Sequence, residues 1–296
     1  MTFIGHGIYY IQHAHVANVE MALANRGSAA DGTRVIAWRS DEAGHDHMWL
    51  VEPVSKEADT YTIRNLLTGT YVDLHGSSSA NGTPIEGWRK NDKDNQKWII
   101  KKEESDGRRW KLQCKATGTF MDLLNGGGSG TPIQGWTGQW SDGTGPGHQH
   151  WLFQRISETS ASILRSSSVI GVDFTSYQAD GLYLIPTREQ LSSILQNSKL
   201  TQMQWRDEIF DYDDFATVFK AEVAKWGNTS FKADGFAVLC GIMFGTKVNP
   251  ETHKLENHAF NWTLDRGDNF GIIFLEPQNG QYSEDAWRYK AYFGFF

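Results

Sequence analysis

The chain has 296 residues, 28 of them lysine or arginine and 35 aspartate or glutamate, which gives a formal net charge of −7. This length predicts about two domains of roughly 150 residues, each large enough to bury a core. The basic residues are dispersed, and without a basic tract to neutralise phosphates a nucleic-acid partner is not expected.

Membrane proteins and disulfide-rich proteins are disfavoured as well. The first residues lack the basic and apolar regions of a signal peptide, and no apolar run approaches the roughly 18 residues that a membrane helix needs. We therefore expect a cytoplasmic protein, or one released by an unconventional route. Cys114 and Cys240 lie in different halves of the chain, which favours two free thiols.

The first half contains a threefold repeat. Residues 121–151 closely resemble residues 71–98 (YVDLHGSSSANGTPIEGWRKNDKDNQKW) in sequence, and residues 21–49 resemble them more weakly. Short apolar runs alternate with Gly, Asp, Asn and Ser clusters, as in short strands joined by turns. Each copy has an inner and a closing tryptophan, which are Trp38 and Trp49, Trp88 and Trp98, and Trp136 and Trp151. The repeat predicts a pseudo-threefold β barrel over residues 1–156 whose closing tryptophans share one core.

The inner tryptophans of the second and third copies suggest sugar sites. Trp88 and Trp136 each follow a glycine and precede a polar loop, so we expect exposed rings that stack on the apolar face of a sugar. A carboxylate and an amide side chain would complete each site by bonding sugar hydroxyls. The candidates are Asp73, Trp88, Asn95 and Gln96 in the second copy and Asp122, Trp136, His148 and Gln149 in the third.

The first copy lacks this combination. Ala22 occupies the carboxylate position, and Asp46 and His47 replace the amide pair, so we expect this site to be degenerate. The closing motifs Gln96-Lys97-Trp98 and Gln149-His150-Trp151 resemble the Gln-x-Trp repeat of the ricin B-type β-trefoil lectins, from which the first copy departs at His47. The resemblance implies sugar binding in the second and third repeats; the alternative is a purely structural trefoil.

The second half has a different pattern. Residues 157–168 are small and polar and predict a linker that runs into a first helix. Thr187 and Gln190 have capping-box spacing and predict a helix to about Gln196, and an apolar stripe predicts a second helix from about Asp213 to Gly227. Three apolar runs, residues 235–245, 258–264 and 270–276, predict strands of one sheet. The result is an α+β unit.

Ionisable residues mark the ends of these elements. Tyr212 lies among aspartates at the start of the second predicted helix, His258 begins one strand and Glu276 ends the next. Neighbouring antiparallel strands would bring the imidazole and the carboxylate together. A nucleophile at a helix start, an imidazole and an orienting acid form the papain-like constellation, but the helix start here holds a tyrosine.

Four segments of the second half, WRDEIFDYDDFATVFKAEVAKWG, GFAVLCGIMFG, NHAFNWTL and FLEPQNG, resemble the mushroom chimerolectins. In that family a ricin-type trefoil precedes a calcium-dependent, papain-like cysteine protease domain that also dimerises. The resemblance implies that residues 157–296 are such a domain, with His258 and Glu276 as catalytic residues and Trp205 shaping the oxyanion site. Tyr212 falls on the nucleophilic cysteine, and a phenol with a reference pKa near 10 does not replace it.

Two features of this half leave alternatives open. Cys240 lies in an apolar run and is either a buried structural cysteine or a substitute thiol close to His258. Several oxygen-bearing side chains suit calcium, namely Asp211, Asp213, Asp214, Gln278 and Asn279. Aspartates are also common at helix starts without a metal, because they accept hydrogen bonds from the free backbone N–H groups there.

The leading hypothesis is a homodimeric fungal lectin for terminal galactose-type or sialylated glycans of glycoproteins or glycolipids, carrying a silent protease-like domain. One alternative is an active calcium-dependent cysteine protease toxin that its lectin domain targets to cells. A third possibility is that the second half serves only as a dimer scaffold.

Overall fold

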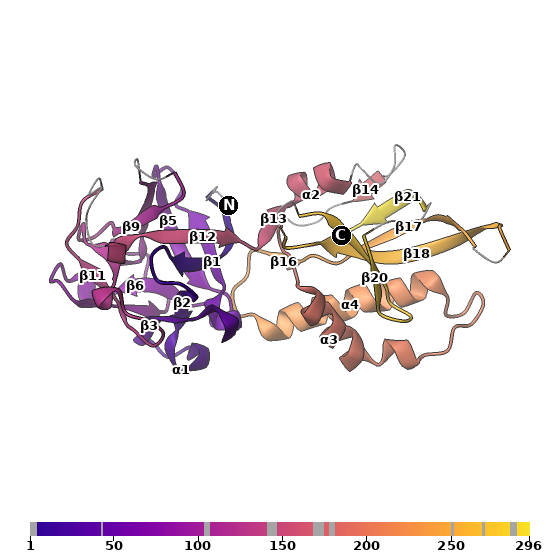
Figure 1. The fold of residues 1–296 in the computed structure, drawn as a ribbon, viewed down its shortest axis with the longest axis horizontal. Helices are drawn as coiled ribbons and strands as arrows, with labels where there is room; N and C mark the ends of the chain where they lie inside the picture. The colour runs from indigo at the N-terminus through magenta and orange to yellow at the C-terminus, as the bar shows by residue number, and fades with distance from the viewer. Residues whose placement is uncertain are drawn as a thin grey trace. The chain divides into compact units, whose positions relative to one another are not determined.

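The computed structural model describes residues 5–42, 44–103, 107–140, 147–167, 175–177, 181–249, 252–267, 270–284 and 289–296. The chain forms two compact units. The first contains residues 1–156 and 230–234, and the second contains residues 157–229 and 235–296 (Figure 1).

The first unit is built from short strands, as the alternation of apolar runs and turn residues predicts. They are β1 (Gly7–His13), β2 (Val19–Leu23), β3 (Thr33–Arg39), β4 (Trp49–Pro53), β5 (Thr60–Asn65), β6 (Tyr71–Leu74), β7 (Thr83–Trp88), β8 (Trp98–Lys102), β9 (Trp110–Cys114), β10 (Phe120–Leu123), β11 (Ile133–Trp136) and β12 (Trp151–Arg155), with a short helix α1 (Ala24–Gly27). Strands β1, β4, β5, β8, β9 and β12 pair around a closed barrel. The hairpins β2–β3, β6–β7 and β10–β11 pair with one another and form a cap. This is a β-trefoil.

The three closing tryptophans form the centre of the first core, which confirms the prediction. Trp49, Trp98 and Trp151 are fully buried among aliphatic side chains. Each indole Nε1 donates a hydrogen bond to a backbone carbonyl, at 2.8 Å to Met21, 3.0 Å to Val72 and 3.1 Å to Met121. A buried indole N–H needs such a partner, and here the partner is the same strand position in every repeat.

A short segment from late in the chain completes this unit. The backbone N–H groups of Lys232 and Ala233 donate to the carbonyl of Leu66 at 3.0 and 3.1 Å. The guanidinium of Arg64 bonds the carboxylate and the backbone carbonyl of Asp234, each at 2.6 Å. Residues 230–234 therefore belong to the first unit although the residues on both sides belong to the second.

Where the structure describes the second unit, it forms a larger and a smaller sheet with helices packed on them. Its elements are β13 (Ser157–Thr159), α2 (Ser160–Ser167), β14 (Thr175–Tyr177), β15 (Leu182–Leu184), α3 (Arg188–Ser198), α4 (Tyr212–Ser230), β16 (Ala237–Val238), β17 (Gly241–Val248), β18 (Leu255–Leu264), β19 (Ile272–Glu276), β20 (Gln281–Ser283) and β21 (Lys290–Phe295). The larger sheet has the order β14-β21-β17-β18-β19-β20, and β13, β15 and β16 form the smaller one.

Helices cover both faces of the larger sheet (Figure 1). Alternate residues of β17 point to opposite faces, so Ile242 packs against Ala216 of α4 while Met243 shares a core with Ile163 of α2. Helix α3 begins after Thr187, whose hydroxyl accepts from the backbone N–H of Gln190, and the capping box is complete as predicted. No helix in the described ranges is long and apolar enough to cross a membrane.

Two predictions about local structure are wrong. The stretch after Ile156 is not a linker, because Ser157–Thr159 pairs with β15 and Ser160–Ser167 is helical. The long helix does not stop at Gly227 but continues to Ser230. A Cβ at Gly227 would come within 2.9 Å of the Val238 side chain, so this glycine permits close packing and does not end the helix.

Candidate functional site

The second repeat brings its predicted site residues together around one carboxylate. Asp73 is 3% exposed and accepts hydrogen bonds from the side-chain amides of Asn95 at 2.7 Å and Gln96 at 3.0 Å. A third amide, that of Asn91, donates to it at 3.0 Å. Sequence reasoning missed Asn91, which lies between the inner and closing tryptophans. Three amide donors hold the carboxylate in one orientation and leave about one of its four lone-pair positions for a hydroxyl.

Burial has an electrostatic consequence at this carboxylate. It raises the pKa of Asp73 to about 6, against the lowering effect of the amide hydrogen bonds, and the charge of Glu86 raises it further. Glu86 lies directly opposite Asp73 in the pairing of β6 with β7 and is 5% exposed. Its Oε1 lies 2.7 Å from Nδ1 of His75, which is exposed. Glu86 was not predicted as part of the site, because only strand register brings it beside Asp73, whereas His75 lies two residues from Asp73 in sequence.

The aromatic platform lies on the same face of this hairpin. Tyr71 pairs with Trp88 two positions from the Asp73 and Glu86 pair, and side chains two residues apart in a strand share a face. Trp88 is partly exposed, as expected for a ring that stacks on a ligand. A cavity of about 300 Å³ adjoins the site, with Tyr71, Lys90 and Gln96 in its wall.

A loop of the first repeat forms one wall of this second-repeat site. Gly32 has φ +86°, and a Cβ there would lie 3.8 Å from the Trp88 ring. The carboxylate of Asp31 accepts from the backbone N–H of Arg89 at 2.7 Å and from its guanidinium at 2.5 Å. No sequence signal indicates this contact, since it joins residues 58 positions apart.

The third repeat has the same construction with different partners. Asp122 is 4% exposed and accepts from the amides of Gln134 and Gln149, both at 3.2 Å. Burial raises the pKa of Asp122, and the two amides and His148 oppose the rise. Trp136 is 39% exposed. The loop of the second repeat approaches it, with Asn81 bonded to Thr137.

His148 occupies the position that Asn95 has in the second repeat. Its ring lies close to the backbone of Gly126, where a Cβ would come within 2.9 Å of it. Among the described residues, the hydrogen-bond donors to Asp122 are the two glutamines. The structure therefore brings together Asp122 and Gln149 as predicted and adds Gln134 to them.

The first repeat has no carboxylate at the equivalent position. Ala22 is buried there, and the imidazole of His47 instead bonds Glu20 at 2.8 Å, both side chains being almost fully buried. Trp38 is 37% exposed, but its Nε1 donates to Glu42 at 3.0 Å. Glu20 lies two residues before the carboxylate position on the same strand face, so a carboxyl group is present there but is hydrogen-bonded to a buried imidazole.

The second unit assembles the predicted imidazole and carboxylate. Nε2 of His258 lies 2.7 Å from Oε2 of Glu276, and the His258 side chain is fully buried. Burial lowers the pKa of His258, whereas Glu276 raises it. We assign the Nε2 proton to the bond with Glu276, which leaves Nδ1 as the basic nitrogen. Within the described part of the chain, Nδ1 has no hydrogen-bond partner.

Tyr212 covers this imidazole. The two ring centroids are 4.1 Å apart, and the centroid of Trp205, 43% exposed, lies 6.1 Å from that of Tyr212. Burial and the negative charges of neighbouring acids raise the pKa of Tyr212, so its phenol stays protonated at neutral pH. Lys247, which sequence reasoning missed, lies with its Nζ 3.2 Å from Nε2 of His258 and 5.5 Å from the centre of the Tyr212 ring.

Cys240 is not a substitute nucleophile. It is fully buried, and desolvation raises the pKa of its thiol to about 12. It precedes β17, whereas the residue paired with His258 is Gly245, five positions further on. Its sulfur accepts from the side-chain amide of Asn261 at 3.7 Å, and Asn261 lies three residues from His258 on β18. At about 3.4 Å per residue the thiol is roughly 10 Å from the imidazole along the strand, beyond hydrogen-bonding reach.

The predicted calcium ligands form two groups, one of aspartates and one of amide side chains. Asp213 hydrogen-bonds the carboxyl of Asp211, which together with burial raises the pKa of Asp213 to about 6. Asp214 accepts from the backbone N–H of Asp211 at 3.2 Å. Gln278 and Asn279 lie in the turn after β19, where their backbone N–H groups donate to Glu276. Across the described ranges, no hydrogen bond joins these amides to the aspartates, and no three His, Cys, Asp or Glu side chains converge as metal ligands.

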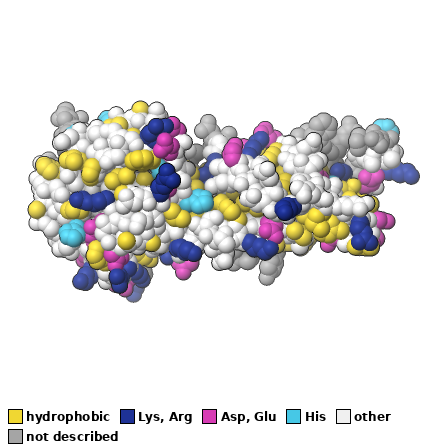
Figure 2. Space-filling model, turned by 90° about the horizontal axis from the view of Figure 1, so that it is seen from below, with side chains coloured by type: hydrophobic (Ala, Val, Ile, Leu, Met, Phe, Trp, Pro, Cys, Tyr) yellow, Lys and Arg dark blue, Asp and Glu magenta, His cyan; other side chains and the backbone are white. Residues whose placement is uncertain are grey.

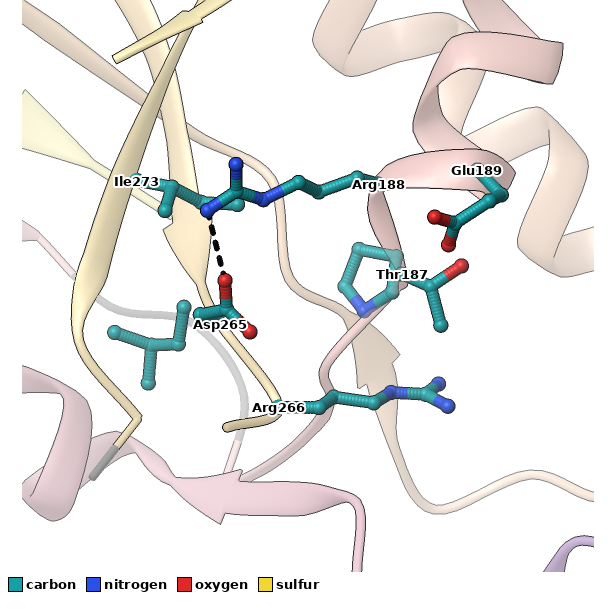
Figure 3. A pocket seen from close by; sticks show the side chains of 8 residues that line it. Thr187, Arg188, Glu189, Asp265, Arg266 and Ile273 are labelled. Atoms are coloured by element: carbon teal, nitrogen blue, oxygen red, sulfur yellow. Dashed lines mark hydrogen bonds and ion pairs between the residues drawn. The ribbon is translucent and has the colours of Figure 1, made fainter. Parts of the chain in front are cut away.

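Another pocket, of about 250 Å³, lies at the start of α3 (Figure 3). Arg188 points toward Asp265 and donates to it at 2.9 Å, and it also bonds Glu284 at 2.7 Å. Arg188 and Asp265 are therefore paired with each other, and none of the predicted site residues lines this pocket. On the molecular face in Figure 2, basic and acidic side chains are likewise intermixed.

Comparisons with known proteins define the class of each unit. A family described as ricin-type beta-trefoil lectin domain-like matches residues 45–136, and one described as agglutinin C-terminal matches residues 183–282. The chain thus joins a ricin B-type β-trefoil to an agglutinin C-terminal domain.

Two solved structures match over 100% of this chain and 100% of their own, each at 48% sequence identity. One is the Polyporus squamosus lectin bound to the human-type influenza-binding epitope Neu5Acα2-6Galβ1-4GlcNAc, with a TM-score of 0.88, and the other is a PSL1a–E64 complex, with a TM-score of 0.87. A search of curated proteins found no match. The chain belongs to the family of the Polyporus squamosus lectin.

Proposed function

We propose that this protein is a lectin that binds terminal galactose-type or sialylated galactose glycans of glycoproteins or glycolipids through its second and third repeats. The observation that carries the proposal is the carboxylate that amide donors hold in each of these repeats, with Asp73 and Trp88 on one strand face. The glycan bound to the 48% identical relative supports the ligand class.

Each group in such a site has a distinct task. The carboxylate accepts a hydrogen bond from a sugar hydroxyl at its remaining lone pair, and the flat tryptophan ring contacts the C–H face of the sugar. The amides of Asn95 and Gln96 hold Asp73 before the ligand arrives, so little ordering is needed on binding. In the third repeat Gln149 and Asp122 have these tasks, with His148 near them.

We also propose that the second unit is a papain-like domain without protease activity. The pairing of His258 with Glu276 supports the papain-like assignment. The Tyr212 ring packs against the imidazole, tilted by 54°, at the place where a nucleophilic thiol would lie, and its raised pKa keeps it un-ionised.

Dimerisation through the second unit would make the lectin multivalent. The second unit exposes large apolar side chains that a partner subunit would cover. The exposed fractions are 68% for Leu255, 52% for Tyr292 and 40% for Phe293. Two sites per chain, doubled in a dimer, increase avidity without new contacts. We expect sedimentation velocity to give the mass of a dimer at micromolar concentration; a monomer at all concentrations would contradict this.

Replacing the two platforms should remove glycan binding. We expect Trp88→Ala and Trp136→Ala each to cost at least about 2 kcal/mol at their own site, roughly thirtyfold in affinity, and together to abolish binding on a glycan array. Trp38→Ala, in the first repeat, is the matched control and should bind normally. Asp73→Ala with Asp122→Ala should also abolish binding, and unchanged binding by this folded double variant would contradict the assignment.

Restoring a thiol at position 212 tests the second unit. We expect no hydrolysis of a general protease substrate by the natural chain and thiol-dependent hydrolysis by Tyr212→Cys, at least about a thousandfold faster. Adding His258→Ala to that variant should remove the activity. An inert Tyr212→Cys would leave the second unit as a dimer scaffold, whereas hydrolysis by the natural chain would establish the protease alternative.

We propose calcium as the cation for Asp211 and Asp213, because two carboxyls that share a proton provide hard oxygens and repel each other once both ionise. The remaining predicted oxygen donors are Asp214, Gln278 and Asn279. At a hundred times its dissociation constant, calcium should stabilise the fold by about 2.7 kcal/mol.

This stabilisation has a pH dependence and a control. It should fall below pH 6, since protons then compete for Asp213, and Asp213→Asn should weaken it at every pH. Thermal melts with calcium and with EDTA measure it. Identical melts at pH 7 would contradict calcium binding.

A further inference from the structure

The second-repeat site contains three ionisable groups in one cluster. Asp73 and Glu86 lie opposite each other on neighbouring strands, and both are buried. Two carboxylates so placed repel each other and favour binding of a proton. His75, at the start of the short helix η3 (His75–Ser77), contacts Glu86 at 2.7 Å from the solvent side and supplies a positive charge when it is protonated.

The other charged groups around this cluster are committed elsewhere or lie at its edge. Asp94 of η4 (Asp94–Gln96) pairs with Lys97 and Lys115, and Arg64 of β5 pairs with Glu52 and Asp234. At the edge, the exposed Arg34 of β3 lies opposite Glu86 in the strand pairing. Burial raises the pKa of the Cys114 thiol, and the charge of Asp73 raises it further. Burial and the amide hydrogen bonds have the largest influence on the pKa of Asp73, and among the charged groups Glu86 raises it and His75 lowers it.

The third-repeat site lacks the second carboxylate. Gln134 occupies the position of Glu86 and donates its amide to Asp122, and Leu124 occupies the position of His75. The charged group near Asp122 is His148, whose protonation would favour the ionised carboxylate. The two sites therefore have the same geometry but opposite electrostatic surroundings.

We propose that the glycan affinity of the second-repeat site falls on mild acidification because Glu86 opposes ionisation of Asp73. The third-repeat site, with Gln134 in that place, keeps its affinity over the same range. This inference rests on the proposed lectin function and adds a pH dependence that separates the two sites.

Proton uptake would act directly on ligand binding. An ionised Asp73 only accepts hydrogen bonds, and it accepts three from side-chain amides. The oxygens of Gln96 and Asn95 already accept from the backbone N–H and the side-chain amide of Asn91, so turning either amide round would break these bonds. A proton on either oxygen turns one acceptor into a donor. Either an amide or the sugar hydroxyl then loses its acceptor, and the weakly held ligand is the one displaced.

The size of the effect follows from the pKa of about 6 at Asp73. The ionised fraction falls from about 0.9 at pH 7 to about 0.1 at pH 5, so the affinity of this site should fall about ninefold. His75 moderates the effect, because its protonated form stabilises the carboxylates as the pH falls.

The experiment measures each site separately in the full chain. Trp136→Ala leaves the second-repeat site and Trp88→Ala leaves the third. Each is titrated calorimetrically with Neu5Acα2-6Galβ1-4GlcNAc at pH 7, 6 and 5. We expect an approximately ninefold loss between pH 7 and 5 for the second-repeat site and less than about threefold for the third.

Matched substitutions identify the cause. In the Trp136→Ala chain, which keeps the second-repeat site, Glu86→Gln introduces the residue that the third repeat has at this position. If the pKa of Asp73 then falls by about one unit, the loss of affinity between pH 7 and 5 should shrink to about twofold. His75→Leu also copies the third repeat but removes a positive charge, so the loss should begin at a higher pH. Carbon-13 NMR titration of the Asp73 carboxyl, without glycan, should follow the same order of pKa values.

The outcomes are distinguishable. Equal pH dependence at the two sites, or a Glu86→Gln variant that loses affinity as steeply as its parent, overturns the inference and leaves the lectin function standing. No binding by either chain at pH 7 overturns the lectin function and the inference together.

Discussion

The first unit depends on one interaction that occurs three times, the hydrogen bond from a buried indole to the backbone of the cap. Trp98 bonds the carbonyl of Val72, and the next residue is Asp73; Trp151 bonds Met121, and the next residue is Asp122. The tryptophan that fills the core therefore also fixes the strand that carries the site carboxylate. Loss of the indole would disturb packing and site together.

The same bond forms in the first repeat, where Trp49 bonds Met21 and the next residue is Ala22. The scaffold is intact there although the carboxylate is missing, so fold and ligand chemistry vary independently on this architecture. The first repeat still lines the proposed second-repeat site through Asp31, whose bond to Arg89 places its loop beside Trp88. A degenerate site can thus be retained as the wall of its neighbour.

Sequence reasoning found the features that repeat, because periodicity reports which residues occupy equivalent places. It separated closing from inner tryptophans, placed Asp73 with Asn95 and Gln96, and paired His258 with Glu276. It missed Glu86 and Lys247, whose proximity to Asp73 and His258 depends on strand register and on contacts between elements. It also took Gly227 for a helix end, since local signals do not show the close approach of Val238.

The second unit places a buried imidazole beside a carboxylate and a tyrosine ring. His258 is buried, and removing Glu276 would leave its Nε2–H without an acceptor, so stability alone favours the pair. Tyr212 packs against the imidazole with its ring tilted by 54°, and Lys247 lies over both Tyr212 and Phe260. These contacts form a packed cluster that excludes water without needing turnover. An arrangement with catalytic geometry is therefore weak evidence for catalysis, and the identity of residue 212 carries more weight than the distance between His258 and Glu276.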